Sequence, residues 1–75
     1  LKPDPVAALD ICQKMDVQPD RIVFVGDSGE DMATAKSAGM FAVGVSWGMR
    51  EVSELQAHGA DEIINTPTEL LDVLP

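Results

Sequence analysis

Two acidic residues follow a short apolar run at a spacing that suits a metal ion. Asp27 comes two residues after the run 21–25, and Asp31 lies about one helical turn further along the chain. Ligands of open α/β sheets bind beyond the carboxyl ends of the strands, so both carboxylates could converge on one hard cation. Mg²⁺ is such a cation, because it prefers oxygen ligands and usually takes one or two carboxylates besides several waters. A metal held here could neutralise a phosphate group.

The same loop also fits a purely structural role. Either Asp27 or Ser28 could cap the helix expected over residues 30–38, with Ser28 and Asp31 forming a pair similar to a capping box. Acidic side chains in a first helical turn also interact favourably with the helix dipole. The loop alone leaves the metal-binding and the capping interpretations open, and both roles can coexist.

A lysine precedes the first expected helix. In Lys2-Pro3-Asp4-Pro5, Asp4 is expected to be the N-cap and Pro5 the first helical residue. A lysine fixed just before this helix could reach a phosphate or a carboxylate as a point charge. An ordinary surface lysine is the alternative interpretation.

Apolar spacing and turn residues predict an alternation of helices and strands. The expected helices cover residues 5–17, 30–38 and 51–57, and a last helix follows a Thr66–Glu69 capping box. The expected strands cover residues 21–25 and 41–45, with a short one near residues 63–64. The first two are unbroken apolar runs, which is typical of parallel strands buried on both faces. The α-β-α-β-α-β-α order predicts an α/β fold with a three-layer, Rossmann-like parallel sheet.

Three strands make a small sheet, so an apolar strand at its edge would leave backbone groups unpaired. We therefore expect the rest of a longer parent chain to pack against the strand 21–25. The chain begins with Leu1 rather than Met, which also favours a fragment or a processed chain.

The first helix carries an apolar stripe, because Ala8, Ile11, Cys12 and Met15 fall at offsets 0, 3, 4 and 7. We expect Cys12 to be a small core residue rather than a nucleophile. As the single cysteine it excludes an internal disulfide and fits a reducing compartment. His58 precedes Gly59 at the end of another helix, where a cation suits the helix C-terminus.

Composition narrows the classes of partner. The chain has 75 residues, 45% of them hydrophobic, and thirteen acidic against five basic residues give a formal net charge of −8. This balance argues against nucleic acid and against an anionic membrane surface as partners. No apolar run approaches about 18 residues and no signal-peptide pattern is present, so we expect a cytoplasmic protein.

The motifs, taken in order, resemble those of the haloacid dehalogenase superfamily and are most similar to its phosphoglycolate phosphatase branch. They are Lys-Pro-Asp-Pro, Val-Phe-Val-Gly-Asp-Ser-x-x-Asp-x-x-x-Ala, Ala-Gly-Met, Gly-Val-x-Trp-Gly and Gly-Ala-Asp. The resemblance covers nearly the whole chain and implies that residues 1–75 are the C-terminal part of the core domain. In this family a magnesium-assisted aspartate attacks a phosphomonoester, and water then hydrolyses the aspartyl-phosphate.

The resemblance also assigns roles. Lys2 matches the lysine that neutralises the nucleophile and binds the transferring phosphoryl group, and Asp27 matches the acid that ligates Mg²⁺. Asp31 matches the second acid of that loop, which usually holds the metal through a water or orients the lysine. Trp47 lies in a loop that is near the substrate entrance in the family, although a packing role fits it equally well.

The sequence departs from the family in what it lacks. It contains no Asp-x-Asp, so the nucleophile motif Asp-x-Asp-Gly-Thr is absent, as are the upstream phosphate-binding Ser or Thr and the cap domain. We therefore expect the parent to hydrolyse a small phosphorylated substrate and this chain alone to be inactive. The alternatives are a phosphomutase or pyrophosphatase of the same superfamily, a non-catalytic interaction module, and a receiver-like signalling module. The lysine precedes the acidic loop here, which counts against a receiver.

Overall fold

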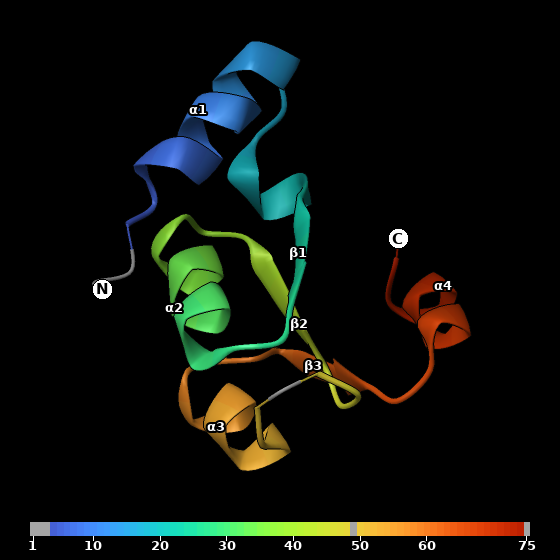
Figure 1. Ribbon diagram of the computed structural model, residues 1–75. Helices are drawn as coiled ribbons and strands as arrows, with labels where there is room; N and C mark the ends of the chain where they lie inside the picture. Colours follow the sequence, from blue (N-terminus) through green and yellow to red (C-terminus); the bar gives the residue numbers. More distant parts are fainter. Residues whose placement is uncertain (1–3, 49, 75) are drawn as a thin grey trace.

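The computed structural model describes residues 4–48 and 50–74 and shows helices alternating with strands (Figure 1). The helices are α1 (Val6–Met15), α2 (Gly29–Ser37), α3 (Val52–Ala57) and α4 (Leu70–Val73). The strands are β1 (Val23–Gly26), β2 (Phe41–Val45) and β3 (Glu62–Ile64). Two 3₁₀ turns, Pro19–Arg21 and Pro67–Glu69, precede β1 and α4. The expected α-β-α-β-α-β-α order is confirmed.

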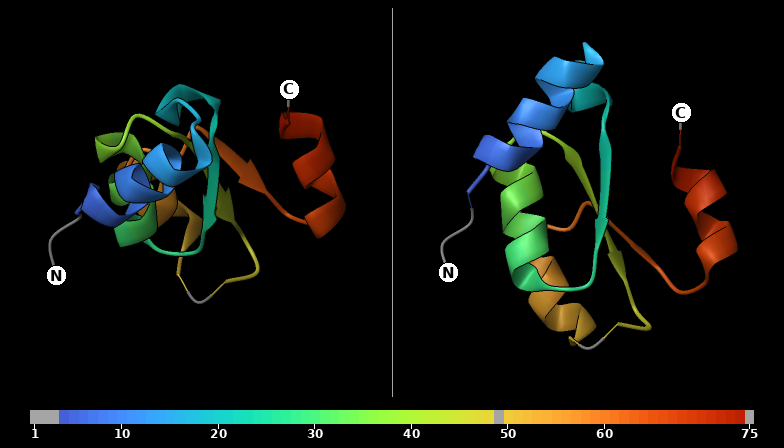
Figure 2. Two further views of the ribbon diagram at one scale, coloured as in Figure 1. Left: turned by 90° about the horizontal axis from the view of Figure 1, so that it is seen from above. Right: turned by 45° about the horizontal axis from the view of Figure 1, so that its top comes forward.

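The three strands form one parallel sheet in the order β1-β2-β3. Val23 pairs with Phe41, and Val43 pairs with Glu62, so β2 is the central strand. Helices α1, α2 and α3 lie on one side of the sheet and α4 lies on the other (Figure 2). This is the predicted three-layer α/β arrangement. No helix in residues 4–48 and 50–74 is long and apolar enough to cross a membrane.

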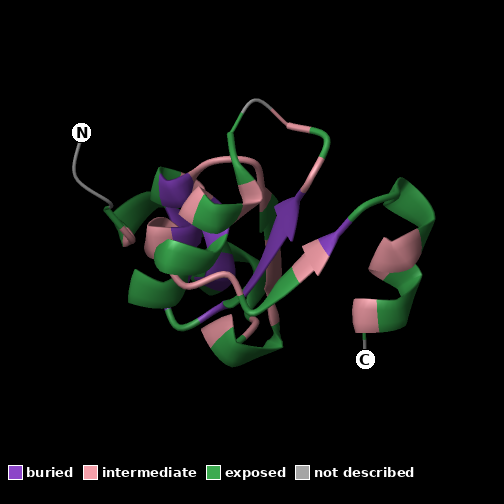
Figure 3. Cartoon of the chain, turned by 90° about the horizontal axis from the view of Figure 1, so that it is seen from below, coloured by how far each residue is buried: buried purple, intermediate pink, exposed green. Residues whose placement is uncertain are grey.

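The core lies mainly on the side of the sheet that three helices cover. There Ala42 of β2 packs in one cluster with Met32 of α2 and Leu55 of α3, all three fully buried. On the opposite face Val43 of β2 packs with Leu70 of α4 in a smaller cluster. Figure 3 shows that buried residues gather on β2, whereas α4 carries none. The sheet is therefore well covered on one face and thinly covered on the other.

Strand β1 differs from the expectation in extent and in burial. It begins at Val23 rather than at residue 21, because Pro19 starts a 3₁₀ turn that runs through Arg21. None of its four residues is buried, and Val25 is 43% exposed. The prediction of a strand buried on both faces is wrong for β1, because β1 is an edge strand of the described sheet. The same prediction is confirmed for β2, where four of five residues are buried.

Helix α1 is shorter than expected and its apolar stripe is only half covered. It ends at Met15 because Asp16 adopts the left-handed conformation, with φ of 55°. Ala8 and Cys12 are buried, which confirms Cys12 as a core residue. Ile11 is 55% exposed, and Met15 is exposed as well. The chain described here therefore offers no complete partner surface for α1.

Two helix starts differ from the predicted capping. The cap position of α1 is Pro5 rather than Asp4, although the Asp4 carboxylate still accepts a hydrogen bond of 2.9 Å from the Val6 N–H.

The predicted Thr66–Glu69 capping box is not formed. This segment is a 3₁₀ turn, and Thr66 makes no side-chain cap. Instead, Glu69 Oε1 accepts from the Thr66 hydroxyl at 3.3 Å, and Glu69 Oε2 accepts from the Asn65 N–H at 3.1 Å.

Candidate functional site

The loop that connects β1 to α2 is held by a serine cap. Ser28 is the N-cap of α2, and its Oγ accepts a hydrogen bond of 3.1 Å from the Asp31 N–H. Such a cap satisfies one of the backbone donors that the first turn of a helix leaves free. The capping role predicted for this loop is confirmed for Ser28, and Asp27 is not the cap.

The Asp31 side chain accepts a hydrogen bond from the start of the same loop. Its Oδ2 accepts a hydrogen bond of 3.1 Å from the Asp27 N–H. The two acidic residues are thus tied to each other through one carboxylate oxygen and one backbone donor. A carboxylate has a second oxygen, so Oδ1 of Asp31 can still bind a cation.

Two glycines let the carboxylates approach the ends of neighbouring strands. A Cβ on Gly26, the last residue of β1, would lie 2.5 Å from the Asp31 Cβ and 2.6 Å from its Oδ2. A Cβ on Gly48, in the loop after β2, would collide with the Asp27 Cβ and lie 3.0 Å from its Oδ2. Side chains at these positions would displace the two acids. The only sequence signal for this packing was the glycine in each motif.

The donor set is compatible with Mg²⁺. The residues that the structure describes contain no cluster of three or more His, Cys, Asp or Glu side chains arranged for a metal. Mg²⁺ does not need such a cluster, because it usually keeps several waters and binds one or two carboxylates. Asp27 and Asp31 supply two, and both lie at the carboxyl end of β1, where α/β sheets bind their ligands.

Of the three predicted site residues, Asp27 and Asp31 come together. Lys2 lies outside the described residues, so its predicted contact with phosphate stays a prediction. Trp47 precedes Gly48 in the loop after β2 and is 52% exposed. Its side chain is therefore not part of the core of the described chain.

Helix α3 touches the loop from the other side, a contact that sequence reasoning missed. Glu54 Oε2 accepts a hydrogen bond of 2.9 Å from the N–H of Gly29, which is the first residue of α2. His58, at the C-terminus of α3, contacts the Glu54 carbonyl through Nδ1 at 2.8 Å. Glu54 and Gly29 are 25 residues apart, so no local spacing could have indicated the bond.

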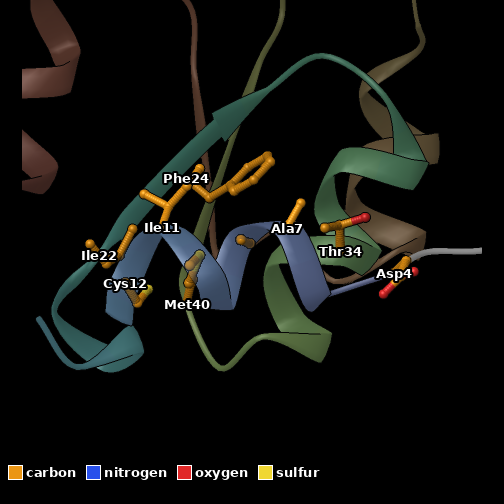
Figure 4. A pocket seen from close by; sticks show the side chains of 9 residues that line it. Asp4, Ala7, Ile11, Cys12, Ile22, Phe24, Thr34 and Met40 are labelled. Carbon is orange, nitrogen blue, oxygen red and sulfur yellow. The ribbon is translucent and has the colours of Figure 1, made fainter. Parts of the chain in front are cut away.

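A separate pocket of about 310 Å³ lies between α1 and β1 (Figure 4). Ile11 and Cys12 of α1 line it together with Phe24 of β1, and Asp4 and Thr34 add polar groups. Because most of its lining is apolar, it suits packed side chains better than a phosphorylated substrate. It therefore does not extend the acidic site.

Comparison with known proteins identifies the family. The family model described as HAD-hydrolase-like matches residues 1–73. The chain belongs to the haloacid dehalogenase-like hydrolases. This membership removes the receiver-like interpretation and confirms the resemblance to the phosphoglycolate phosphatase branch.

Two curated relatives match almost the whole chain. One is N-acetylmuramic acid 6-phosphate phosphatase of Pseudomonas aeruginosa, 38% identical over 74 residues, which cover 97% of this chain and 33% of that protein. The other is phosphoglycolate phosphatase of Chromobacterium violaceum, 38% identical over 73 residues, which cover 97% and 32%. The chain thus spans about a third of the length of these relatives.

The fold agrees with a solved haloacid dehalogenase-like structure. A conserved protein of this kind from Agrobacterium tumefaciens superposes with a TM-score of 0.87 at 30% identity. The match covers 97% of this chain and 35% of that one. The three parallel strands and their helices therefore have a haloacid dehalogenase-like, Rossmann-like fold.

Proposed function

We propose that residues 1–75 are the C-terminal part of the core domain of a magnesium-dependent phosphomonoesterase similar to phosphoglycolate phosphatase. The observation that carries this proposal is the pairing of Asp27 and Asp31 at the carboxyl end of β1, in a chain of this hydrolase family. A structural cap alone would not need both acids, since Ser28 already supplies the cap.

Each site residue has a distinct part in the proposal. Asp27 and Asp31 hold Mg²⁺, Asp31 either directly or through a water, and Lys2 binds the phosphate as a point charge. Bound Mg²⁺ supplies positive charge opposite the phosphoryl oxygens, which is most of what phosphoryl transfer requires of a protein. The attacking aspartate and the substrate-selecting cap belong to the rest of the parent chain, so the aspartyl-phosphate forms outside residues 1–75.

The edge of the sheet supports a larger core. Strand β1 is an edge strand with Val25 exposed, and the apolar pocket beside it is open to further side chains. Ile11 of α1 also stays exposed although it lines that pocket. Since the chain spans about a third of its relatives, we propose that the rest of the parent chain pairs with β1 and fills this pocket.

The substrate class is a small phosphomonoester. The phosphatases from P. aeruginosa and C. violaceum match this chain at the same 38% identity, although their names give different substrates. The choice of substrate is therefore assigned to the parts of the parent outside residues 1–75. We also propose a cytoplasmic location, which agrees with Cys12 as a buried free thiol.

The test uses the complete parent protein and its Asp27→Asn variant. Hydrolysis of p-nitrophenyl phosphate is measured at increasing Mg²⁺, with release of inorganic phosphate as the readout. The variant keeps the side-chain volume but loses the charge, so we expect at least about a hundredfold loss of activity. Asp20→Asn is the matched control, because Asp20 is exposed and lies before β1, at the opposite end of the strand.

Full activity of Asp27→Asn would refute the metal assignment. Failure of the parent to release phosphate from any phosphomonoester, pyrophosphate included, would refute the hydrolase. Conversion of a sugar phosphate into its isomer without phosphate release would instead establish a phosphomutase.

A further inference from the structure

Two side chains at helix α3 contact Gly29, the first residue of α2. Glu54 accepts from the Gly29 N–H at 2.9 Å, and the imidazole of His58 covers the Gly29 Cα. A Cβ on Gly29 would lie 2.5 Å from the His58 Nδ1, so this contact leaves no room for a side chain. Gly29 is buried although it lies next to the acidic loop.

Glu54 supplies an acceptor for the Gly29 N–H, which has no acceptor within its own helix. The first N–H groups of a helix lack intrahelical acceptors, and Ser28 caps only the Asp31 N–H. A buried N–H left without an acceptor is costly. Glu54 also places a negative charge at the positive end of the α2 dipole, where it is stabilising.

Three hydrogen bonds then connect α3 to the two acids in series. Glu54 fixes the N–H of Gly29, the neighbouring Ser28 accepts from the Asp31 N–H, and Asp31 accepts from the Asp27 N–H. Displacement of Gly29 would move the Ser28 backbone to which it is bonded. The Asp31 carboxylate and the backbone of Asp27 are therefore connected to a residue of a different helix.

We propose that Glu54 is a positioning residue for the metal site, which sets the affinity for Mg²⁺ by fixing the first turn of α2. This inference rests on the proposed metal role of Asp27 and Asp31. It extends that role to a side chain that touches neither the metal nor the substrate. Partners of metal ligands typically contribute a factor of about 10 to 100 in metal affinity or activity. Because Glu54 acts through the backbone, the lower end applies.

Two conservative variants distinguish the effect of the length of the Glu54 side chain from the effect of its negative charge. Glu54→Asp keeps the charge but is one methylene shorter, so it cannot hold the Gly29 N–H at the same distance. Glu54→Gln keeps the reach and an acceptor oxygen but loses the charge. Glu51→Asp is the matched control, because Glu51 precedes the same helix and its side chain makes no cap.

The readout is the dissociation constant for MgCl₂, measured by titration calorimetry on the metal-free complete parent protein. The Mg²⁺ concentration for half-maximal hydrolysis of p-nitrophenyl phosphate is measured in parallel. Glu54→Asp should weaken Mg²⁺ binding about tenfold, with the hydrolysis rate recovering at saturating Mg²⁺. Glu54→Gln should stay within about threefold of wild type, because its amide oxygen still accepts from the Gly29 N–H. The small remaining loss reflects the weaker hydrogen bond of a neutral acceptor. Glu51→Asp should match wild type.

Wild-type Mg²⁺ affinity of Glu54→Asp, alongside lost affinity in Asp27→Asn, would overturn the positioning role and leave the metal site intact. A strong loss in Glu54→Gln with none in Glu54→Asp would also overturn it, because charge rather than the hydrogen bond would then matter. A lowered unfolding temperature in Glu54→Asp without any change in Mg²⁺ affinity would reduce Glu54 to a structural cap. Unchanged affinity in Asp27→Asn would refute the proposed metal site itself.

Discussion

Gly48 packs against Asp27, so Gly48→Ala should disturb the proposed metal ligand without touching any charged group. The added Cβ would collide with the Asp27 Cβ and lie 3.0 Å from its Oδ2, whereas ordinary contacts begin near 3.4 Å. The loop after β2 and the loop after β1 approach each other at this point because β1 and β2 are adjacent parallel strands. One of the two loops must therefore move.

The expected magnitude follows from the size of that movement. Relief of the collision requires a displacement of roughly 1 Å, and a misplacement of this size at an active site can cost about a hundredfold in rate. A hundredfold loss corresponds to about 2.7 kcal/mol of transition-state stabilisation. Gly48→Ala should therefore lower kcat/KM of the parent protein about a hundredfold, with a higher Mg²⁺ requirement.

The assay is Mg²⁺-dependent hydrolysis of p-nitrophenyl phosphate by the parent protein, with circular dichroism to confirm that the variant folds. Ser53→Ala on the exposed side of α3 is the control for a neighbouring substitution by alanine. A folded Gly48→Ala variant with wild-type kcat/KM and Mg²⁺ requirement would refute the reasoning. In that case the loop after β2 would have moved away and left Asp27 in place.

Two further predictions concern stability and completeness. Asp61→Ala should lower the unfolding free energy by about 1–3 kcal/mol, because the buried Ala42 N–H, 2.8 Å from Asp61 Oδ2, loses its acceptor. Burial raises the pKa of Asp61, but its bonds to Ala42 and Lys36 outweigh this and hold the pKa below the ordinary 3.8. The stabilisation is therefore present above about pH 4 and lost as the pH falls through the lowered pKa, which urea unfolding against pH checks. Equal stability of Asp61→Ala and wild type at neutral pH would contradict this. The 75-residue chain alone should release no phosphate from p-nitrophenyl phosphate with Mg²⁺, and turnover above an Asp27→Asn background would show that it contains its own nucleophile.

Local patterns predicted the parts of this fold that local forces determine. Strand β2 was found at residues 41–45, because an apolar run between two turns has few other structures to adopt. The Ser28 cap was found because a side chain and an N–H three residues apart meet in any helix start. The acidic pair was found for the same reason, since Asp27 and Asp31 lie four residues apart.

The wrong or missed predictions concern burial and contacts that depend on segments distant in the sequence. Burial of β1 depends on what lies beside it, and among the described residues its outer edge has no partner strand. Ile11 fits the apolar stripe of α1, yet the described chain does not cover it. The contact of Glu54 with Gly29 depends on how α3 folds over α2, which no spacing along the chain records.

Hydrogen bonds within the protein stabilise the acidic loop without a metal. The carboxylates of Asp31 and Glu54 both lie at the start of α2, where like charges repel. The backbone N–H groups that they bind offset this repulsion, as does Arg50, whose Nη1 lies 3.9 Å from Glu54 Oε1. Each of the two bonded carboxylates accepts a bond from an N–H at or before the start of α2, where the helix dipole also favours negative charge. The proposed metal site, arranged in this way, would need little rearrangement on binding a cation. We therefore expect its affinity to depend on the hydrogen bonds that hold the loop as well as on the ligands themselves. This is why substitutions at Gly48 and Glu54, which change no proposed ligand, are expected to change the Mg²⁺ requirement.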